Sequence, residues 1–201
     1  MNSLQNLLRV LPLARVKPKK VLLLASSVCA VVALIVFFVC WRITYLRSPQ
    51  FVLDETVHAL QVGDFSSIYR LGYPAERKFL NITPQAVKDI LQATIWRHGY
   101  PQEPKVMYFP SNLEDVKQWL VTWEKPKFKE SQNLAVVVMQ SPNGRWGLNV
   151  SALLANICRM VGLSYNDLAQ KEGLRGVCLE PYSYMDFDGQ VVSEQSFSEG
   201  R

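Results

Sequence analysis

The feature that most constrains this chain is an uninterrupted apolar run near its start. Residues 21–41 contain no charged side chain, and 13 of these 21 residues are Val, Leu, Ile or Phe. A helix of this length at about 1.5 Å per residue spans about 31 Å, which is close to the thickness of the hydrocarbon core of a bilayer. We therefore predict one transmembrane helix over residues 21–41, with the lipid bilayer as its first partner.

A cleaved signal peptide and a buried core helix are the alternatives for this run. A signal peptide has an apolar region of about 7–15 residues followed by small residues at the cleavage site. Here the run is longer and ends in the sequence FFVCWR at residues 37–42, without such a site. A soluble core helix seldom extends this far without a polar face. We therefore expect the run to remain as an anchor.

Charge is divided sharply along the chain. Seven of the 22 Lys and Arg residues precede Ser48 and no Asp or Glu does, so residues 48–201 hold 15 cations against 17 acids, a net charge of −2. The pI of about 9.0 therefore belongs to the segment around the apolar run, and we expect no nucleic-acid partner. Five cations precede residues 21–41 and two follow closely, which predicts a cytoplasmic N-terminus and a domain outside.

These patterns predict five segments. They are a basic cytoplasmic tail (1–20), the transmembrane helix (21–41), a linker (42–50), an α+β soluble domain (51–180) and a tail (181–201). Within the first segment, Leu4, Leu7, Leu8 and Leu11 have helical spacing. An amphipathic helix on the membrane surface and a disordered tail both remain open for this segment.

Helical periodicity begins after the linker. Leu53, Thr56, Val57 and Leu60 follow the i, i+3, i+4, i+7 pattern of an amphipathic helix, which Gly63 is suited to end. We expect a short helix after Asp64, acting as its N-cap, and a third helix from Thr83-Pro84 to Gly99.

Strand patterns then replace the helical ones. We expect strands at residues 106–109, 116–123 and 134–139, the second with Trp119, Val121 and Trp123 on one face. The turn sequence SPNG at 141–144 predicts a hairpin whose second strand is residues 145–150. A helix is expected after Ser151, ending at Gly162, and a shorter one after the capping box that begins at Ser164. From Gly173 onward the pattern weakens.

Helices that precede an antiparallel meander indicate an α+β fold with extra C-terminal helices. The chain resembles the NTF2-like (cystatin-like) superfamily, in which helices pack into a curved antiparallel sheet. The residues that carry the resemblance are VHALQVGDF at 57–65, similar to an ALxxGD helix end, and NGRWGL at 143–148, similar to a dGrWkl strand. The resemblance covers residues 50–150, and membrane-tethered members share the predicted layout of a short inside tail, one helix and an outside domain.

Few side chains suggest chemistry. His58 lies one helical turn from Asp54 and Glu55, which allows an acid–base or metal cluster, but a solvated helix face is the simpler interpretation. Asp64 is a weak candidate for a pocket carboxylate in an NTF2-like cone, against its role as an N-cap. We therefore predict no catalytic residue, no metal site and no cofactor.

Other residues suggest structure or binding. Cys158 and Cys178 are a possible disulfide if the domain lies outside, with buried thiols as the alternative. Trp119, Trp123 and Trp146 are possible lining residues of a cavity on the curved sheet, with sheet core as the alternative. Asn81 and Asn149 each begin a glycosylation sequon. Residues 157–169 resemble a helix-turn-helix, but the segment 164–170 that would contact DNA has no Lys or Arg.

These observations favour a non-enzymatic, single-pass membrane protein that presents an extracytoplasmic α+β domain to a partner or a small ligand. One alternative is a subunit of an envelope or secretion assembly. Another is a hydrolase or isomerase that uses a pocket in the NTF2-like cone, with Asp64 or His58 as its catalytic group.

Overall fold

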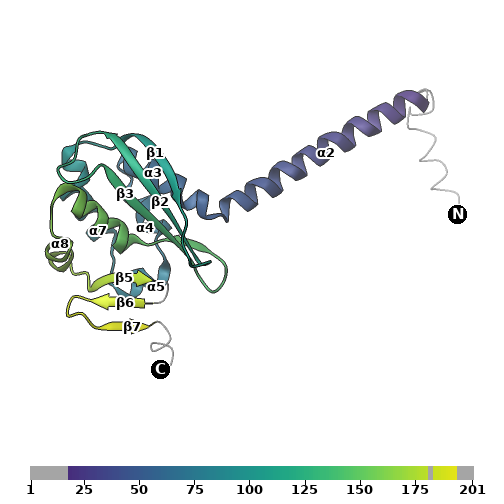
Figure 1. Ribbon diagram of the computed structural model, residues 1–201. Helices are drawn as coiled ribbons and strands as arrows, with labels where there is room; N and C mark the ends of the chain where they lie inside the picture. Colours follow the sequence, from purple (N-terminus) through teal and green to yellow (C-terminus); the bar gives the residue numbers. More distant parts are fainter. Residues whose placement is uncertain (1–17, 181–182, 194–201) are drawn as a thin grey trace. The chain divides into compact units, whose positions relative to one another are not determined.

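The computed structural model describes residues 18–180 and 183–193 (Figure 1). The chain divides into two units, residues 1–46 and 47–201. The expectations for Leu4 to Leu11 and for residues 194–201 lie outside the described residues.

The helices are α2 (Pro18–Leu46), α3 (Pro49–Val62), α4 (Phe65–Leu71), α5 (Pro74–Phe79), α6 (Pro84–Ala93), the 3₁₀ helix η2 (Ile95–His98), α7 (Val150–Val161) and α8 (Tyr165–Lys171). The strands are β1 (Gln102–Phe109), β2 (Val116–Lys125), β3 (Asn133–Gln140), β4 (Trp146–Leu148), β5 (Gly176–Glu180), β6 (Ser183–Asp186) and β7 (Val191–Ser193).

The first unit contains one continuous helix, α2, which is longer than the predicted residues 21–41. Its part from Ser27 to Leu46 is long and apolar enough to cross a membrane. Large apolar side chains along it are exposed, including Phe37. The rings of Trp41 and Tyr45 stack with their centroids 6.2 Å apart near the end of the helix.

In the second unit, the helix ends follow local chemistry. The Ser48 hydroxyl accepts a hydrogen bond from the backbone nitrogen of Phe51 (3.2 Å) at the start of α3. Gly63 ends this helix with a φ of 76°, in the left-handed region that favours glycine. Thr83 caps α6 by accepting from the nitrogen of Ala86 (3.1 Å), as its position before a proline predicts.

The predicted helix from Thr83 to Gly99 is interrupted. Regular α6 ends at Ala93, and Thr94 has φ −110° and ψ −104° before the chain resumes as η2. The buried Thr94 hydroxyl donates to the carbonyl of Ile90 (2.5 Å), a side-chain bond that competes with the helical pattern. The indole nitrogen of Trp96 in η2 donates to the carbonyl of Leu60 (3.2 Å), which ties this turn to α3.

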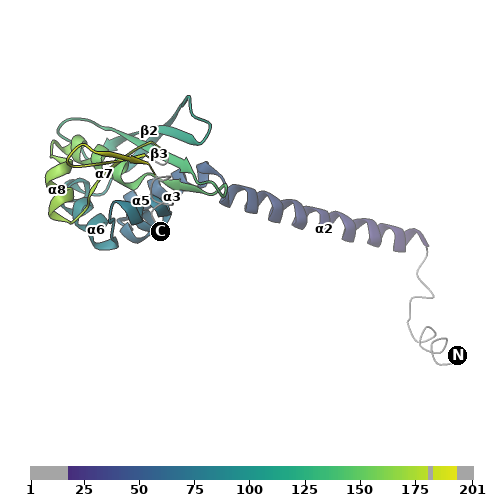
Figure 2. The same ribbon diagram turned by 90° about the horizontal axis from the view of Figure 1, so that it is seen from below.

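A four-stranded antiparallel sheet has the order β1-β2-β3-β4. In β2, Trp119, Val121 and Trp123 are buried and alternate with less buried residues, as the sequence predicted. The outcome is an α+β architecture, in which α5 and α6 lie to one side of β2 and β3 (Figure 2).

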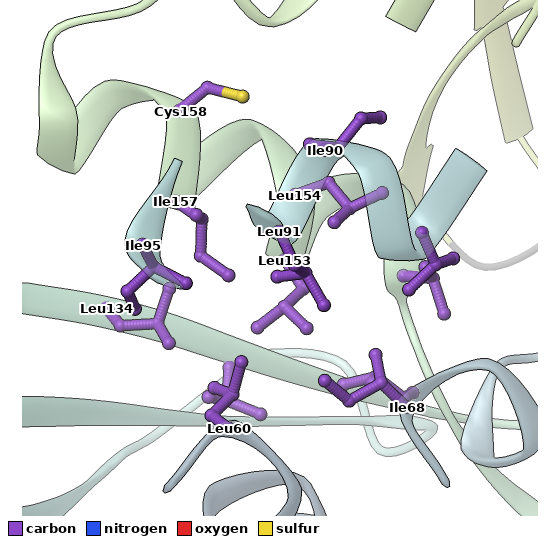
Figure 3. Close-up of a cluster of buried hydrophobic side chains, with 14 of the residues drawn as sticks. Leu60, Ile68, Ile90, Leu91, Ile95, Leu134, Leu153, Leu154, Ile157 and Cys158 are labelled. Carbon is purple, nitrogen blue, oxygen red and sulfur yellow. The ribbon is translucent and has the colours of Figure 1, made fainter. Parts of the chain in front are cut away.

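The hydrophobic core lies between the sheet and these helices. Figure 3 shows buried side chains of α3, α4, α6, η2 and α7 in one cluster with Leu134 of β3. The helix α7 is apolar on most of its circumference because it packs against both β3 and the other helices. Its N-cap is Asn149, so the helix begins at Val150, two residues before the expected start after Ser151, and β4 is correspondingly shorter than the expected residues 145–150.

The second sheet, β5-β6-β7, lies where the sequence pattern weakens after Gly173, and its strands β6 and β7 fall within the segment 181–201 that was expected to be a tail. Its strands are three to five residues long, too short to show a clear alternation in sequence. A Cβ atom on Gly176 would lie 2.0 Å from the carbonyl oxygen of Met185, so this pairing requires glycine. Strand pairing therefore extends to Ser193.

Candidate functional site

The four-stranded sheet has an open edge at β1 that carries exposed apolar side chains. β1 is the first strand in the sheet order and pairs only with β2 among the described strands. Four consecutive apolar residues of this strand are exposed: Val106 (47%), Met107 (64%), Tyr108 (50%) and Phe109 (57%). Natural edge strands are usually blunted by charges or bulges, and consecutive exposed apolar residues mark an interaction site. We call residues 105–109 with their free backbone edge the β1 edge.

Both faces of this strand contribute to the β1 edge. Val106 lies opposite Val121, and Tyr108 lies opposite Trp119. The side chains of Val106 and Tyr108 therefore lie on the same face of the sheet as these two core residues. The ring of Tyr108 meets that of Trp119 edge-on, with centroids 5.7 Å apart. Met107 lies on the other face, opposite Leu120. The apolar surface of the sheet thus continues beyond the region that the helices cover.

Successive residues of β1 direct their backbone N–H and C=O groups alternately toward β2 and toward the open edge. The N–H of Trp123 donates to the carbonyl of Gln132 (3.0 Å), so Trp123 turns its polar groups toward the β3 side. Pro104 lies opposite Trp123 and has no N–H, which suits a position whose polar groups face away from β2. Because successive residues alternate, the N–H and C=O groups of Val106 and Tyr108 point to the open edge.

Charged residues lie at one end of the same strand pair. Lys105 pairs with Glu124 across the strands, and Lys125 lies 3.9 Å from Glu103. The contact with Glu124 raises the pKa of Lys105 and lowers that of Glu124. Exposed pairs of this kind contribute little to stability, but they make this end of the strand polar. The apolar part of the β1 edge is therefore bounded on one side by these charged residues.

A second notable place is a buried carboxyl group that the sequence did not single out. Glu76 of α5 is fully buried and accepts hydrogen bonds from the backbone nitrogens of Val150 (2.9 Å) and Ser151 (2.7 Å). These are the first two residues of α7, where unpaired N–H groups and the helix dipole favour an acceptor. Burial raises the pKa of Glu76 to about 7, although these bonds and the charge of Arg77 act in the opposite direction.

Neighbouring polar groups connect this carboxyl to the second sheet. The side chain of Asn149 accepts from the nitrogen of Ala152 (2.9 Å), and the hydroxyl of Ser151 accepts from the nitrogen of Cys178 (2.8 Å). Glu76, Asn149 and Ser151 thus join α5, α7 and β5. We call these three residues the buried polar cluster. All the hydrogen bonds just described come from the protein's own backbone nitrogens, so the buried polar cluster has a structural role.

The chain matches no family model, no curated protein and no solved structure.

Asp64 occupies the N-cap position of α4. One carboxylate oxygen accepts from the nitrogen of Ser67 (3.1 Å), and the two oxygens accept from the hydroxyls of Ser66 and Ser67 (2.6 Å each). These bonds, those of the hydroxyls first, lower the pKa of Asp64 to about 2. The carboxylate is thereby engaged in capping its own helix.

His58 is exposed on α3, one turn from the exposed Asp54. Among residues 18–180 and 183–193, no group of three or more His, Cys, Asp or Glu side chains is placed to hold a metal ion. The structure therefore brings His58 and Asp54 together only on a solvated face of the helix.

Cys158 and Cys178 are both buried and no disulfide joins them, as in the alternative of buried thiols that the sequence left open. Cys178 donates its N–H to the hydroxyl of Ser151 at the start of α7, and Cys158 follows seven residues later. Seven residues of helix advance about 10 Å, so Cys158 lies well along α7 from the point where Cys178 is bound. Figure 3 shows Ile157 directed toward Leu134 and Cys158 directed elsewhere.

The three tryptophans fall in or beside the hydrophobic core. Trp119 and Trp123 belong to it, and Trp146 is half-buried against it. The indole nitrogen of Trp123 is buried without a hydrogen-bond acceptor. These positions agree with the sheet-core interpretation that was left open.

The sequons also have distinct surroundings. Asn149 is buried and its side chain caps α7. Asn81 is exposed, and its amide donates to the carbonyl of Gly173 (2.9 Å). Of the two, only Asn81 presents its side chain at the surface.

Sequence reasoning placed β1 as a strand but did not identify it as an edge. The sequence KVMYF between Pro104 and Pro110 was a usable signal, because prolines at strand ends are typical of edges. Glu76 gave only a weak signal, as a single acid in the first turn of a short helix after Pro74. Its partners lie more than 70 residues away, so only the tertiary structure reveals its role.

Proposed function

We propose that this chain is a non-enzymatic, single-pass membrane protein that presents residues 47–193 outside the cytoplasm to a protein partner. The β1 edge is the surface that receives the partner, as an extended strand added to the sheet. The observation that carries the proposal is the run of four exposed apolar residues on an open strand. Strand addition combines backbone hydrogen bonds with side-chain contacts on both faces, and the β1 edge offers both.

The membrane part of the proposal rests on α2. Its apolar side chains from Val28 to Trp41 are exposed to the surroundings, and a soluble protein would have to cover them. The excess of Lys and Arg before the apolar run supports a cytoplasmic N-terminus.

The surroundings of Asp64 and His58 favour a binding role over the hydrolase or isomerase alternative. Asp64 caps α4, and His58 lies on an exposed face of α3. A subunit of an envelope or secretion assembly is a specific form of the same proposal. The NTF2-like resemblance stays a prediction about ancestry and cavity shape.

The anchor is tested by extraction. Full-length protein is expected to stay in the membrane pellet after washing with alkaline carbonate and to be released only by detergent. A protease added to intact cells is expected to remove a tag placed after Arg201. Release by carbonate, or protection of the tag, would contradict the anchor or its orientation respectively.

The binding surface is tested by photocrosslinking in the membrane. The photoreactive amino acid p-benzoylphenylalanine replaces Tyr108 in the full chain, and the matched control carries it in place of Lys171, an exposed residue of α8. Ultraviolet light is expected to produce a covalent adduct from position 108 and not from position 171. Absence of any adduct at position 108 would overturn the proposed binding surface.

A further inference from the structure

We propose that the occupant of the β1 edge is the β1 edge of a second copy of this chain, paired antiparallel about a twofold axis at Met107. This inference rests on the proposed function and names the partner for the same surface. Two four-stranded sheets would thereby become one continuous eight-stranded sheet. A twofold contact of this kind uses one patch twice, so the patch must be complementary to itself.

The backbone of β1 meets that requirement. Pro104 and Pro110 each lie three residues from Met107, so the segment between them is symmetric in its hydrogen-bonding capacity. Val106 and Tyr108 carry the outward N–H and C=O groups, as their positions relative to Pro104 and Trp123 indicate. In the register centred on Met107, Val106 of each copy faces Tyr108 of the other and exchanges two hydrogen bonds with it. The prolines then lie opposite each other and end the ladder at both sides of the paired segment, because neither can donate an N–H.

The side chains are also compatible in this register. Val106 meets Tyr108 of the second copy, a β-branched and aromatic pair that favours cross-strand contact. Met107 meets its own copy, and Lys105 meets Phe109. No like charges face each other, because the acids Glu103 and Glu124 lie beyond the paired segment and beside their own lysines. A shift by two residues in one direction would instead place Lys105 beside Met107, which removes the pairing of apolar side chains at that end.

The size of the contact explains why the membrane matters. Five residues of one strand cover much less than the area of about 800 Å² per partner that stable interfaces bury. The pair is therefore expected to be weak in dilute solution and to form when two anchored chains share one membrane, where their effective concentration is higher.

Cysteine crosslinking of the full chain in membranes tests the register. The background carries Cys29→Ala and Cys40→Ala, because these two cysteines are exposed on α2, whereas Cys158 and Cys178 are buried. Met107→Cys is expected to give a covalent dimer on mild oxidation, since directly opposed residues lie about 5 Å apart at Cβ. The matched surface control is Lys171→Cys, and its yield measures random collision. Val106→Cys and Tyr108→Cys are expected to crosslink with each other when coexpressed and to crosslink weakly when expressed alone.

A backbone variant separates strand pairing from simple proximity. Val106→Pro removes an N–H that points away from β2, so β1 keeps its bonds to β2 while the open edge loses a donor on each copy. In the Met107→Cys chain this change is expected to reduce the dimer yield at least about tenfold, toward the Lys171→Cys level. A circular dichroism spectrum that matches the parent establishes that the variant is folded, and Tyr108→Pro serves as a second variant if it is not.

The outcomes distinguish this inference from the proposed function. A Met107→Cys yield no higher than that of Lys171→Cys would overturn the second copy as occupant. If the photocrosslinker at position 108 still gives an adduct of another mass, the binding surface stands and the partner is a different protein. If neither experiment gives an adduct, both proposals are wrong.

Discussion

The carboxylate of Glu76 accepts a hydrogen bond at 2.7 Å from the backbone nitrogen of Ser151, 75 positions later in the chain. The same Ser151 receives the N–H of Cys178 on its hydroxyl, so one residue links α5 to the second sheet through the start of α7. Helix N-termini in protein cores need an acceptor for their unpaired N–H groups, and a side chain from a distant segment supplies it here. The buried polar cluster thereby fixes how three segments meet.

Replacing Glu76 with Ala is expected to lower the free energy of unfolding by about 2–4 kcal/mol, because two buried N–H groups lose their acceptor and a space remains. Denaturant unfolding of the full chain in detergent, followed by tryptophan fluorescence, measures this loss. The control is Glu114→Ala on an exposed loop, where a change below about 0.5 kcal/mol is expected. Equal stability of the two variants would contradict the role of Glu76.

The stability of the domain is expected to fall as pH rises from about 4.5 to about 7. The pKa of Glu76 is about 7 in the folded protein against an ordinary value of 4.5, so between these values the folded state binds more protons than the unfolded state. The free energy of unfolding then decreases with rising pH, by up to about 3 kcal/mol from this group. Glu76→Gln is expected to flatten the profile in this window. A parent profile that is already flat there would contradict the raised pKa.

Asp64→Ala is expected to destabilise the domain by about 1 kcal/mol, since the first turn of α4 loses its cap. Asp64→Asn retains an acceptor oxygen and serves as the matched control, with a smaller loss. Because the pKa of Asp64 is lowered to about 2, its contribution is present above about pH 4 and disappears as the pH falls toward 2. Thermal melts at pH 7 and pH 2.5 check both statements; a catalytic role would instead leave stability unchanged.

Cys158 and Cys178 are expected to remain thiols in the folded protein. Burial raises the pKa of Cys158 to about 12, which disfavours the reactive thiolate. A maleimide reagent is expected to spare both residues in the native domain and to label both after denaturation without reductant, as counted by mass spectrometry. Labelling only after reduction would indicate the disulfide that the structure lacks.

The order of the main elements was predictable because their signals are local. Ser48, Thr83 and Ser164 each cap a helix within three residues of their own position, and the alternation of Trp119, Val121 and Trp123 comes from the strand itself. The strands of the second sheet were not predicted, because each is too short to show a pattern. The strands β5 to β7 are held by pairing with one another and by the bond from Cys178 to Ser151, none of which leaves a periodic pattern in sequence.

By itself, the sequence determined the apolar helix, the partition of charge and the α+β class, since each depends on composition or on spacing within a few residues. Only the tertiary structure decided which side chains became functional candidates. Glu76 is buried because α5 packs on the start of α7, and Val106 to Phe109 are exposed because the order of the strands leaves β1 at an edge. An apolar residue in a strand has the same sequence signature in the core and at an edge, and its neighbours across the sheet decide which of the two it occupies.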